Sequence, residues 1–294
     1  MKRIVLIGLG TIAKHHLEAL QQTPGIEIAG ICDLRSEAAE DRCFAGIPFD
    51  TDWTRLVDNV RPDTVLILTP PQAHRALAER CIEHGLEVII EKPLAETRED
   101  VRQLLQQKHW TPVYHSICGP EVRWWEAHRP QQPIDAIRIA FSDPYADERG
   151  KIQVSKRVLG GSWLDSGVNA LALLALWVPL EQIQDSYITH KTDETCRLHY
   201  RSDYKALIGA TKVEIEVRWD KGINHKETII ESGGHTYVLN HSRQSVECDG
   251  EILFQDESCE RLTAQYKAFY ANYPHLTLPI AETEQIYQIL FDHL

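Results

Sequence analysis

The chain has 294 residues, of which 43% are hydrophobic and 25% charged, as in an ordinary globular protein. Its formal net charge of −12 would repel nucleic-acid phosphates, and no basic run interrupts this balance, so we expect no nucleic-acid partner. The seven cysteines form no Cys-x-x-Cys pair and have no metal-like spacing, so we expect free thiols, a reducing compartment and no metal.

The sequence also lacks the apolar segments that membranes and secretion require. No stretch approaches the length needed to cross a bilayer. The run Ile4–Ile7 follows two basic residues, but it is too short for the apolar core of a signal peptide, and glycines interrupt it at once. We therefore expect a soluble, cytoplasmic protein.

The first part of the chain alternates short apolar runs with helical patterns. Continuous Val, Ile and Leu runs separated by helices indicate a parallel sheet covered on both faces, which is a doubly wound Rossmann fold. We expect strands at Ile4–Gly8, Ile26–Cys32, Val65–Leu68, Glu87–Ile90 and Pro112–His115, and helices at Ile12–Gln22, Gln72–His84 and Thr97–Lys108.

After about Cys118 the pattern changes to many alternating strands. Turn pairs such as Gly233-Gly234 and Asp249-Gly250 separate several of them, which indicates a large, mostly antiparallel sheet. Helical patterns cover Trp163–Trp177, Cys259–Tyr270 and Glu282–Leu294. We expect two domains, residues 1–118 for dinucleotide binding and residues 119–294 for catalysis and oligomerisation.

A glycine-rich loop separates the first strand from the first helix. In Gly8-x-Gly10-x-x-Ala13, the first glycine permits a tight turn and the second lets the backbone approach a pyrophosphate. The helix that follows offers unpaired N–H groups to an anion, so Gly8, Gly10, Thr11 and Ile12 are candidate cofactor-binding residues. The loop alone is a weak signal, because glycine turns also serve packing.

Asp33, at the end of the second strand, strengthens this interpretation. It lies 23 residues beyond Gly10, where a carboxylate can accept hydrogen bonds from the adenosine ribose and so favours NAD over NADP. Arg35 complicates the preference, because a guanidinium can stack on adenine or pair with a 2′-phosphate. An ordinary surface arginine would have the same sequence. We expect NAD, with NADP also accepted.

Two further segments follow strands and so fall on the edge where open α/β sheets bind ligands, which makes Thr69, Pro70, His74, Glu91 and Lys92 candidate cofactor-binding residues. In Thr69-Pro70-Pro71-Gln72-Ala73-His74 the prolines can simply end a strand and start a helix, with His74 exposed on the first turn. Glu91-Lys92-Pro93 follows an apolar strand, where a partly buried lysine can move a proton or anchor a substrate. A surface lysine before a proline would look the same.

The segment Gly160–Ala170 opens an otherwise apolar helix and carries two polar residues. Asp165 and Asn169 are four residues apart, so we expect them on one helix face, where they can bind hydroxyls and move a proton. Ser162-x-x-Asp165 also fits a capping box. Asn169 does not fit that alternative, because an amide inside an apolar helix is disfavoured unless its hydrogen bonds are met.

Taken in order, these segments resemble the glucose–fructose oxidoreductase/inositol dehydrogenase (Gfo/Idh/MocA) family over essentially the whole chain. The matching features are the glycine loop with His16, Thr69-Pro70 with His74, Glu91-Lys92-Pro93-Leu94-Ala95, and Gly160-Gly161 leading to Asp165-x-Gly167. The resemblance implies that Lys92 and Asp165 surround the hydride-transfer centre. It also implies a Rossmann domain, a second domain with a large sheet, and a homodimer or homotetramer.

One position departs from the family pattern. Most members carry histidine four residues after the aspartate, whereas this chain has Asn169. Asp-x-Gly-x-Asn-Ala is similar to the aldose 1-dehydrogenase branch, which oxidises L-arabinose or D-galactose at the anomeric carbon. That implies hydride transfer from an aldose C1 to give a lactone, with Lys92 or Asp165 removing the proton and Asn169 binding the sugar.

Other interpretations stay open at this point. The chain can be another sugar or polyol dehydrogenase or reductase of the same family, or a sensor of sugars or dinucleotides without catalysis. Further side chains are candidates for the sugar site, although ordinary packing explains each of them equally well. They are His115, Tyr145 and Trp163.

Overall fold

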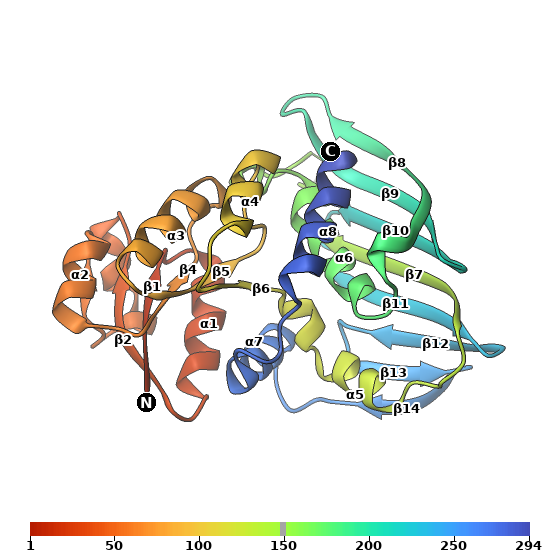
Figure 1. The fold of residues 1–294 in the computed structure, drawn as a ribbon, viewed down its shortest axis with the longest axis horizontal. Helices are drawn as coiled ribbons and strands as arrows, with labels where there is room; N and C mark the ends of the chain where they lie inside the picture. Colours follow the sequence, from red (N-terminus) through yellow and green to blue (C-terminus); the bar gives the residue numbers. More distant parts are fainter. Residues whose placement is uncertain (148–150) are drawn as a thin grey trace. The chain divides into compact units, whose positions relative to one another are not determined.

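The computed structural model describes residues 1–147 and 151–294 (Figure 1). The chain divides into two units, each built on its own sheet. The first unit comprises Met1–Tyr114 and Leu262–Thr277, and the second comprises His115–Arg261 and Leu278–Leu294. A C-terminal segment therefore returns to the N-terminal unit.

The first unit contains a parallel sheet of six strands in the order β3-β2-β1-β4-β5-β6. Its central strands are apolar throughout because helices cover both faces, which confirms the doubly wound fold. The order reverses between β1 and β4, so the loops after these two strands diverge at the edge where such sheets bind ligands. The strands are β1 (Lys2–Ile7), β2 (Ile26–Cys32), β3 (Phe49–Asp50), β4 (Thr64–Ile67), β5 (Glu87–Glu91) and β6 (Trp110–Val113).

The helices of this unit begin at recognisable signals. Asp52 caps α2 by accepting from the Thr54 N–H at 2.9 Å, and Thr97 caps α4 by accepting from the Asp100 N–H at 3.1 Å. Helix α1 buries a stripe at helical spacing that includes Ala13. The helices are α1 (Thr11–Gln21), α2 (Trp53–Val60), α3 (His74–Glu83), α4 (Arg98–Leu105) and α7 (Arg261–Asn272), with 3-10 turns η1 (Ser36–Glu40), η2 (Arg42–Phe44) and η3 (Pro71–Ala73).

The second unit contains an eight-stranded sheet in the order β14-β13-β12-β11-β7-β10-β9-β8. Among its described strand pairs only β7 and β10 run parallel, so the predicted mostly antiparallel sheet is confirmed. The strands are β7 (Ile134–Asp143), β8 (Ile183–Asp193), β9 (Leu198–Ile208), β10 (Thr211–Trp219), β11 (His225–Ser232), β12 (His235–Asn240), β13 (Ser245–Cys248) and β14 (Glu251–Gln255).

The helices of the second unit include one that differs from the prediction. Instead of one α-helix over Trp163–Trp177, the chain forms a π-helical segment η6 (Trp163–Gly167) followed by α6 (Val168–Ala175). Gly167 permits this because the Trp163 ring packs against it, and a Cβ there would lie 2.7 Å from that ring. The other helices are α5 (Pro120–His128) and α8 (Ile280–Asp292), with 3-10 turns η4 (His115–Cys118), η5 (Val154–Leu159) and η7 (Leu180–Gln182).

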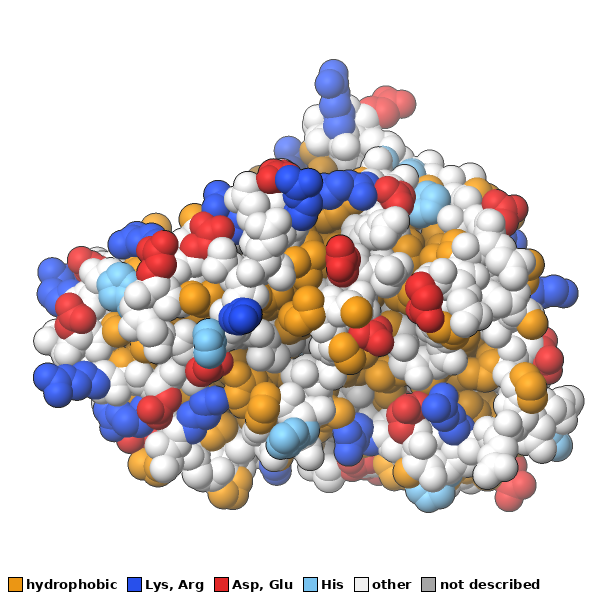
Figure 2. Space-filling model, viewed as in Figure 1, with side chains coloured by type: hydrophobic (Ala, Val, Ile, Leu, Met, Phe, Trp, Pro, Cys, Tyr) orange, Lys and Arg blue, Asp and Glu red, His pale blue; other side chains and the backbone are white. Residues whose placement is uncertain are grey.

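The surfaces of the units carry both signs of charge. On the face drawn in Figure 2, Lys and Arg side chains are interspersed with Asp and Glu side chains. One face of the eight-stranded sheet bears ion pairs such as Arg201 with Glu216 and Lys205 with Glu214. Within the part of the chain that the structure describes, no helix is long and apolar enough to span a membrane.

Candidate functional site

The loop between β1 and α1 has the geometry of a phosphate cradle. Gly8 has a φ of +98°, and a Cβ there would lie 2.7 Å from the Leu68 carbonyl carbon, so only glycine fits. A Cβ on Gly10 would meet no described atom within 4 Å, which leaves open space beside the backbone. Helix α1 then starts at Thr11 without a side-chain cap from the described residues. Such a start, with the N–H groups of Thr11 and Ile12, attracts an anion.

The segment after β4 lies beside this loop. Ile67 pairs with Ile7 of β1, so Thr69 and Pro70 emerge next to Gly8 at the point where the strand order reverses. The Thr69 hydroxyl oxygen is buried and has no hydrogen-bond partner among the described residues. A bound ligand can satisfy that group, which is the usual reason for an unsatisfied polar atom at a site.

Asp33 forms the other wall of the loop. One carboxylate oxygen accepts from the Leu9 N–H at 2.7 Å, and the Arg35 guanidinium lies against both oxygens at 2.9 and 3.0 Å. Burial acts to raise the pKa of Asp33, but the hydrogen bonds from Arg35 and Leu9 outweigh it and lower that pKa. Asp33 is therefore ionised and joins the glycine loop to the end of β2, while Arg35 stays exposed.

His74 is buried, whereas the two prolines before it suggested an exposed position on the first turn of a helix. It is only 1% exposed, and its ring nitrogens lie 2.6 Å from the Thr69 carbonyl oxygen and 3.0 Å from the Pro93 carbonyl oxygen. Burial lowers the pKa of His74, while hydrogen bonds to these two carbonyls act in the opposite direction. The ring thus links the segments that follow β4 and β5, and holds the backbone beside Lys92.

Glu91, which the sequence assigned to cofactor binding, is instead taken up by protein groups. It is 4% exposed, and one oxygen accepts from the Tyr266 hydroxyl at 2.9 Å and lies 2.9 Å from His16 Nε2. The other oxygen accepts from the Lys92 N–H at 3.0 Å. The Tyr270 hydroxyl lies 2.5 Å from His16 Nδ1 and completes the cluster. Glu91 therefore joins α1 and α7 to β5 and fixes the backbone at Lys92.

Sequence analysis missed the tyrosines of this cluster. Tyr266 and Tyr270 are four residues apart on α7, where they read as part of the apolar stripe of a helix in the second domain. In the structure, α7 belongs to the first unit. No local pattern in the sequence indicates that this distant segment packs there. Lys92 itself follows β5 and is half-buried.

In the second unit, Asp165 lies in the π-helical segment η6 and is 6% exposed. The capping-box alternative is wrong, because Ser162 already has helical angles (φ −63°, ψ −34°) and makes no side-chain cap with the described chain. The prediction that Asp165 and Asn169 share one face of a regular α-helix also needs correction. Asp165 lies in the π-helical segment and Asn169 in α6, so the spacing between them is not that of a continuous α-helix. Single π turns inside helices are frequent at functional sites.

A buried ion pair supports the turn that carries Asp165. Lys226 Nζ on β11 lies 2.5 Å from Asp143 Oδ1 at the end of β7, and Asp143 Oδ2 accepts from the Ser166 hydroxyl at 2.8 Å. Burial lowers the pKa of Lys226, and the charge of Asp143 opposes that shift. The chain of contacts therefore anchors Ser166, next to Asp165, to the sheet. Sequence analysis missed Asp143 and Lys226 because nothing local distinguishes them from strand-end charges.

Asn169 is the most informative polar residue in this unit. It is 5% exposed on α6, and its side-chain oxygen is buried with no hydrogen-bond partner among the residues described. Its backbone carbonyl accepts from the Ser116 hydroxyl at 3.2 Å, so the helix itself is tied to η4. A buried amide oxygen without a donor costs free energy unless a ligand supplies one.

The remaining candidate sugar-site residues fall in different surroundings. Trp163 is fully buried, and its indole N–H donates to the Leu290 carbonyl at 3.0 Å, so it belongs to the core rather than to a sugar site. His115 is 7% exposed at the start of η4. Tyr145 is half-buried, with Lys156 Nζ 4.3 Å from its ring centre. Burial, together with Asp165 and Asp143, raises the pKa of the Tyr145 hydroxyl.

The residues present fit a dinucleotide in the first unit. The glycine cradle, the uncapped start of α1 and the ionised Asp33 at the end of β2 supply the groups that bind a pyrophosphate and a ribose. The Glu91 carboxylate is already hydrogen-bonded within the protein. The candidate cofactor-binding groups that remain are the loop residues, Asp33, Arg35 and the backbone after β4 and β5.

Several proteins of known name match part of the chain. A D-apiose dehydrogenase from Paraburkholderia graminis is 32% identical over 142 residues, which is 47% of this chain and 36% of that protein. Glycosyl hydrolase family 109 protein 2 from Akkermansia muciniphila is 29% identical over 120 residues, 37% of this chain and 25% of that protein. The matches span only about a third or less of these relatives, whose names describe different reactions.

The whole chain resembles solved structures more broadly than the sequence matches reach. An oxidoreductase from Agrobacterium radiobacter in complex with NAD+, L-tartaric acid and magnesium superposes with a TM-score of 0.81 at 16% identity. The superposition covers 99% of this chain and 95% of that one. At this identity the likeness shows the fold alone, including the eight-stranded sheet of the second unit.

The segment that carries the cofactor cradle is similar to a known family. Residues 2–112 match the family described as oxidoreductase family, NAD-binding Rossmann fold. This segment contains the glycine loop, Asp33, the residues after β4 and the Glu91-Lys92-Pro93 turn. The match to this oxidoreductase family therefore covers the segment with the cofactor cradle and stops before the second unit.

Proposed function

We propose that this protein is an NAD-dependent dehydrogenase that oxidises a CH–OH group of a sugar, with the anomeric carbon of an aldose as its preferred position. The observation that carries the proposal is the buried oxygen of Asn169, which has no partner among the described residues and lies four residues after the buried Asp165. A sugar hydroxyl is a donor of the right kind for that oxygen.

The side chains divide the work by their chemistry. Oxidation of an alcohol removes a hydride and a proton, and bound NAD supplies the hydride acceptor. The proton must pass to a protein group, and either Asp165 or Lys92 can take it while the other orients the hydroxyl. Asn169 cannot act as a base near neutral pH, so its role is to hold a hydroxyl of the sugar.

The residue at position 169 supports the proposal of the anomeric carbon. A histidine at position 169 would provide a second titratable group, whereas Asn169 provides only hydrogen bonds. The anomeric hydroxyl is more acidic than an ordinary secondary hydroxyl, so a single base is sufficient to remove its proton. The product of a cyclic aldose oxidised in this way is a lactone.

The test is NAD reduction by the purified protein with a panel of aldoses and polyols, followed by absorbance. We expect L-arabinose- or D-galactose-like aldoses to give the highest kcat/KM. Asp165→Asn should lower kcat by about a hundredfold or more and leave sugar binding partly intact, since a positioned proton acceptor typically contributes 10²–10⁴-fold. If polyols reduce NAD faster than every aldose, the anomeric assignment is wrong.

Two alternatives give other results in the same assay. Another sugar or polyol dehydrogenase or reductase of the family would reduce NAD with polyols, or oxidise NADH with a ketose. A sensor without catalysis would bind NAD and sugar with no turnover, which calorimetry would detect. For assembly we propose a homodimer or homotetramer, which sedimentation would resolve.

A further inference from the structure

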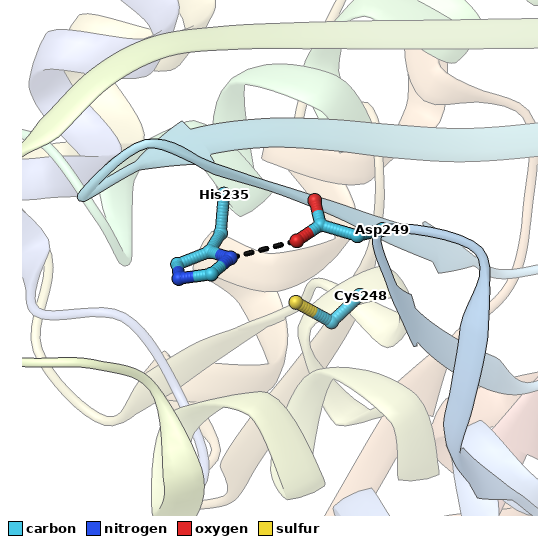
Figure 3. A group of neighbouring side chains, drawn as sticks. All are labelled: His235, Cys248 and Asp249. Carbon is cyan, nitrogen blue, oxygen red and sulfur yellow. Dashed lines mark hydrogen bonds and ion pairs between the residues drawn. The ribbon is translucent and has the colours of Figure 1, made fainter.

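A histidine, a cysteine and an aspartate converge on the edge of the eight-stranded sheet, on strands that the proposed reaction does not use. They are His235, Cys248 and Asp249 (Figure 3). One ligand atom from each lies within 4.8 Å of the other two. In Figure 3 the three side chains come from neighbouring strands and gather in one place.

Strand register explains why they meet. Tyr237 of β12 pairs directly with Cys248 of β13, so the side chains of these two residues lie on one face of the sheet. His235 precedes Tyr237 by two residues and therefore shares that face. Two further bonds fix the turn, because the Asp249 N–H donates to the Thr236 carbonyl at 2.9 Å and the Thr236 N–H donates to Asp249 Oδ1 at 2.9 Å.

The turn that carries two of the three residues is also tightly defined. Asp249 and Gly250 have φ angles of +50° and +87°, as in a two-residue hairpin turn between β13 and β14. The Asp249 carboxylate is thereby directed to His235, whose Nδ1 lies 2.7 Å from Asp249 Oδ2. Backbone pairing and the turn therefore bring the three residues together.

The chemistry of these donors matches one class of cation. An imidazole nitrogen, a thiolate and a carboxylate oxygen are the three ligand types of zinc, which often keeps water in its fourth position. A bound divalent cation would favour the thiolate form of Cys248. Exposed acids alone would attract harder ions, but the sulfur and nitrogen donors select a softer one.

We propose that His235, Cys248 and Asp249 bind one divalent cation of the zinc class, with water as the remaining ligand. The ion joins the start of β12 to the β13–β14 turn and so stabilises the outer strands of the sheet. None of its ligands belongs to the residues proposed for NAD or sugar, so turnover does not depend on it.

The probe is Co²⁺, which replaces zinc and gives thiolate charge-transfer and tetrahedral d–d absorption. The full-length protein is treated with a chelator, kept reduced and titrated with Co²⁺ and then with Zn²⁺. We expect one equivalent of Co²⁺ to develop the thiolate band and one equivalent of Zn²⁺ to remove it. Amide exchange should slow at β12 and β13 when Zn²⁺ is bound.

Variants assign the ligands. Cys248→Ser should abolish the thiolate band, and His235→Ala should weaken Zn²⁺ binding by more than the roughly 10–100-fold that loss of an outer partner costs. The matched control is Cys259→Ser, because Cys259 is half-exposed like Cys248 and lies outside the cluster. All three variants should retain wild-type NAD reduction.

Two results would overturn the proposal. One is a wild-type protein that develops no thiolate band with Co²⁺ under reducing conditions. The other is a band that survives in Cys248→Ser or disappears in Cys259→Ser, which would place the ion elsewhere. Because NAD turnover is read separately, failure of the metal site leaves the proposed dehydrogenase activity intact, and the reverse also holds.

Discussion

The two units build their polar sites in different ways. In the first unit the cradle is a backbone device: Gly8, Gly10 and the start of α1 lie within one loop, and Asp33 reaches Leu9 from the adjacent strand. In the second unit the support of Asp165 is made of side chains from distant segments. Lys226 and Asp143 are 83 residues apart, and both are buried.

This difference bears on how each site tolerates change. A backbone cradle depends on glycines and on helix geometry, so most side-chain substitutions leave it in place. A buried ion pair depends on both partners, because removing one leaves the other charge buried without compensation. We therefore expect the second unit to lose stability at single positions, while the first unit changes mainly in ligand preference.

The largest expected effect comes from the buried pair. Lys226→Met should lower the free energy of unfolding by about 3–5 kcal/mol, because Asp143 loses its buried counter-ion. Lys205→Met is the matched control, since Lys205 pairs with Glu214 on the same sheet but with both side chains about half exposed, and it should change the free energy of unfolding far less than Lys226→Met does. Denaturant unfolding measures both. Equal losses would show that the buried contact chain contributes nothing special.

The sequence predicted the local residues of the first unit better than the long-range contacts. The glycine loop, Asp33 and Lys92 could be predicted as candidates because motif and strand end lie close together in the sequence. Asp143 and Lys226 were not, since only the register of β7 with β11 brings them together. The same holds for Tyr266 and Tyr270, which depend on the return of α7 to the first unit.

The second prediction concerns Lys92 in the first unit. Lys92→Ala should lower kcat by roughly a hundredfold or more, the usual scale for a positioned proton-transfer group, with little change in NAD affinity. Lys108→Ala, at an exposed position of the same unit, is the control and should behave as wild type. Steady-state kinetics and NAD binding are measured separately. Near-normal turnover of Lys92→Ala would return Lys92 to an ordinary surface role.

The fold was more predictable than the local geometry of the site. Apolar runs and turn residues were sufficient to predict the class of both sheets, because they report burial on one or two faces. The π turn at Asp165 was predicted as regular α-helix. A π turn contains about one residue more than an α turn, and the spacing of apolar residues in one short segment does not distinguish the two. In the structure the Trp163 ring packs against Gly167 at the end of this turn.

The third prediction tests the unsatisfied amide. Asn169→Ala should chiefly raise the KM for the sugar, because it removes one hydrogen bond to the substrate and leaves the base in place. The rise in KM should correspond to a loss of about 1–3 kcal/mol of binding free energy. Asn169→His adds bulk and a titratable ring, so we expect it to impair aldose oxidation rather than improve it. Kinetics over a range of pH separate the two. A fall in kcat alone for Asn169→Ala would contradict the binding role.

The smallest expected effect is a change of cofactor preference. It tests whether the cradle of the first unit depends on its backbone alone or also on the Asp33 side chain. The Asp33 carboxylate repels a 2′-phosphate and also holds the Arg35 guanidinium at 2.9 Å. Asp33→Ser removes the repulsion and releases Arg35, which can then pair with phosphate. Wild type should prefer NAD, and the variant should shift the NADP to NAD ratio of kcat/KM by roughly tenfold, or about 1.5 kcal/mol, the lower end for a hydrogen bond to a charged group.

Arg35 decides whether that shift has the stated cause. In the Asp33→Ser background, Arg35→Ala should remove most of the gain with NADP and leave kcat/KM with NAD nearly unchanged. The Leu9 N–H also loses its acceptor in Asp33→Ser, so unfolding must be measured beside the kinetics. If the double variant keeps the NADP gain, loss of repulsion alone explains the shift. If Asp33→Ser changes stability but not preference, Asp33 only braces the loop, and the cradle would then depend on side chains as the second unit does.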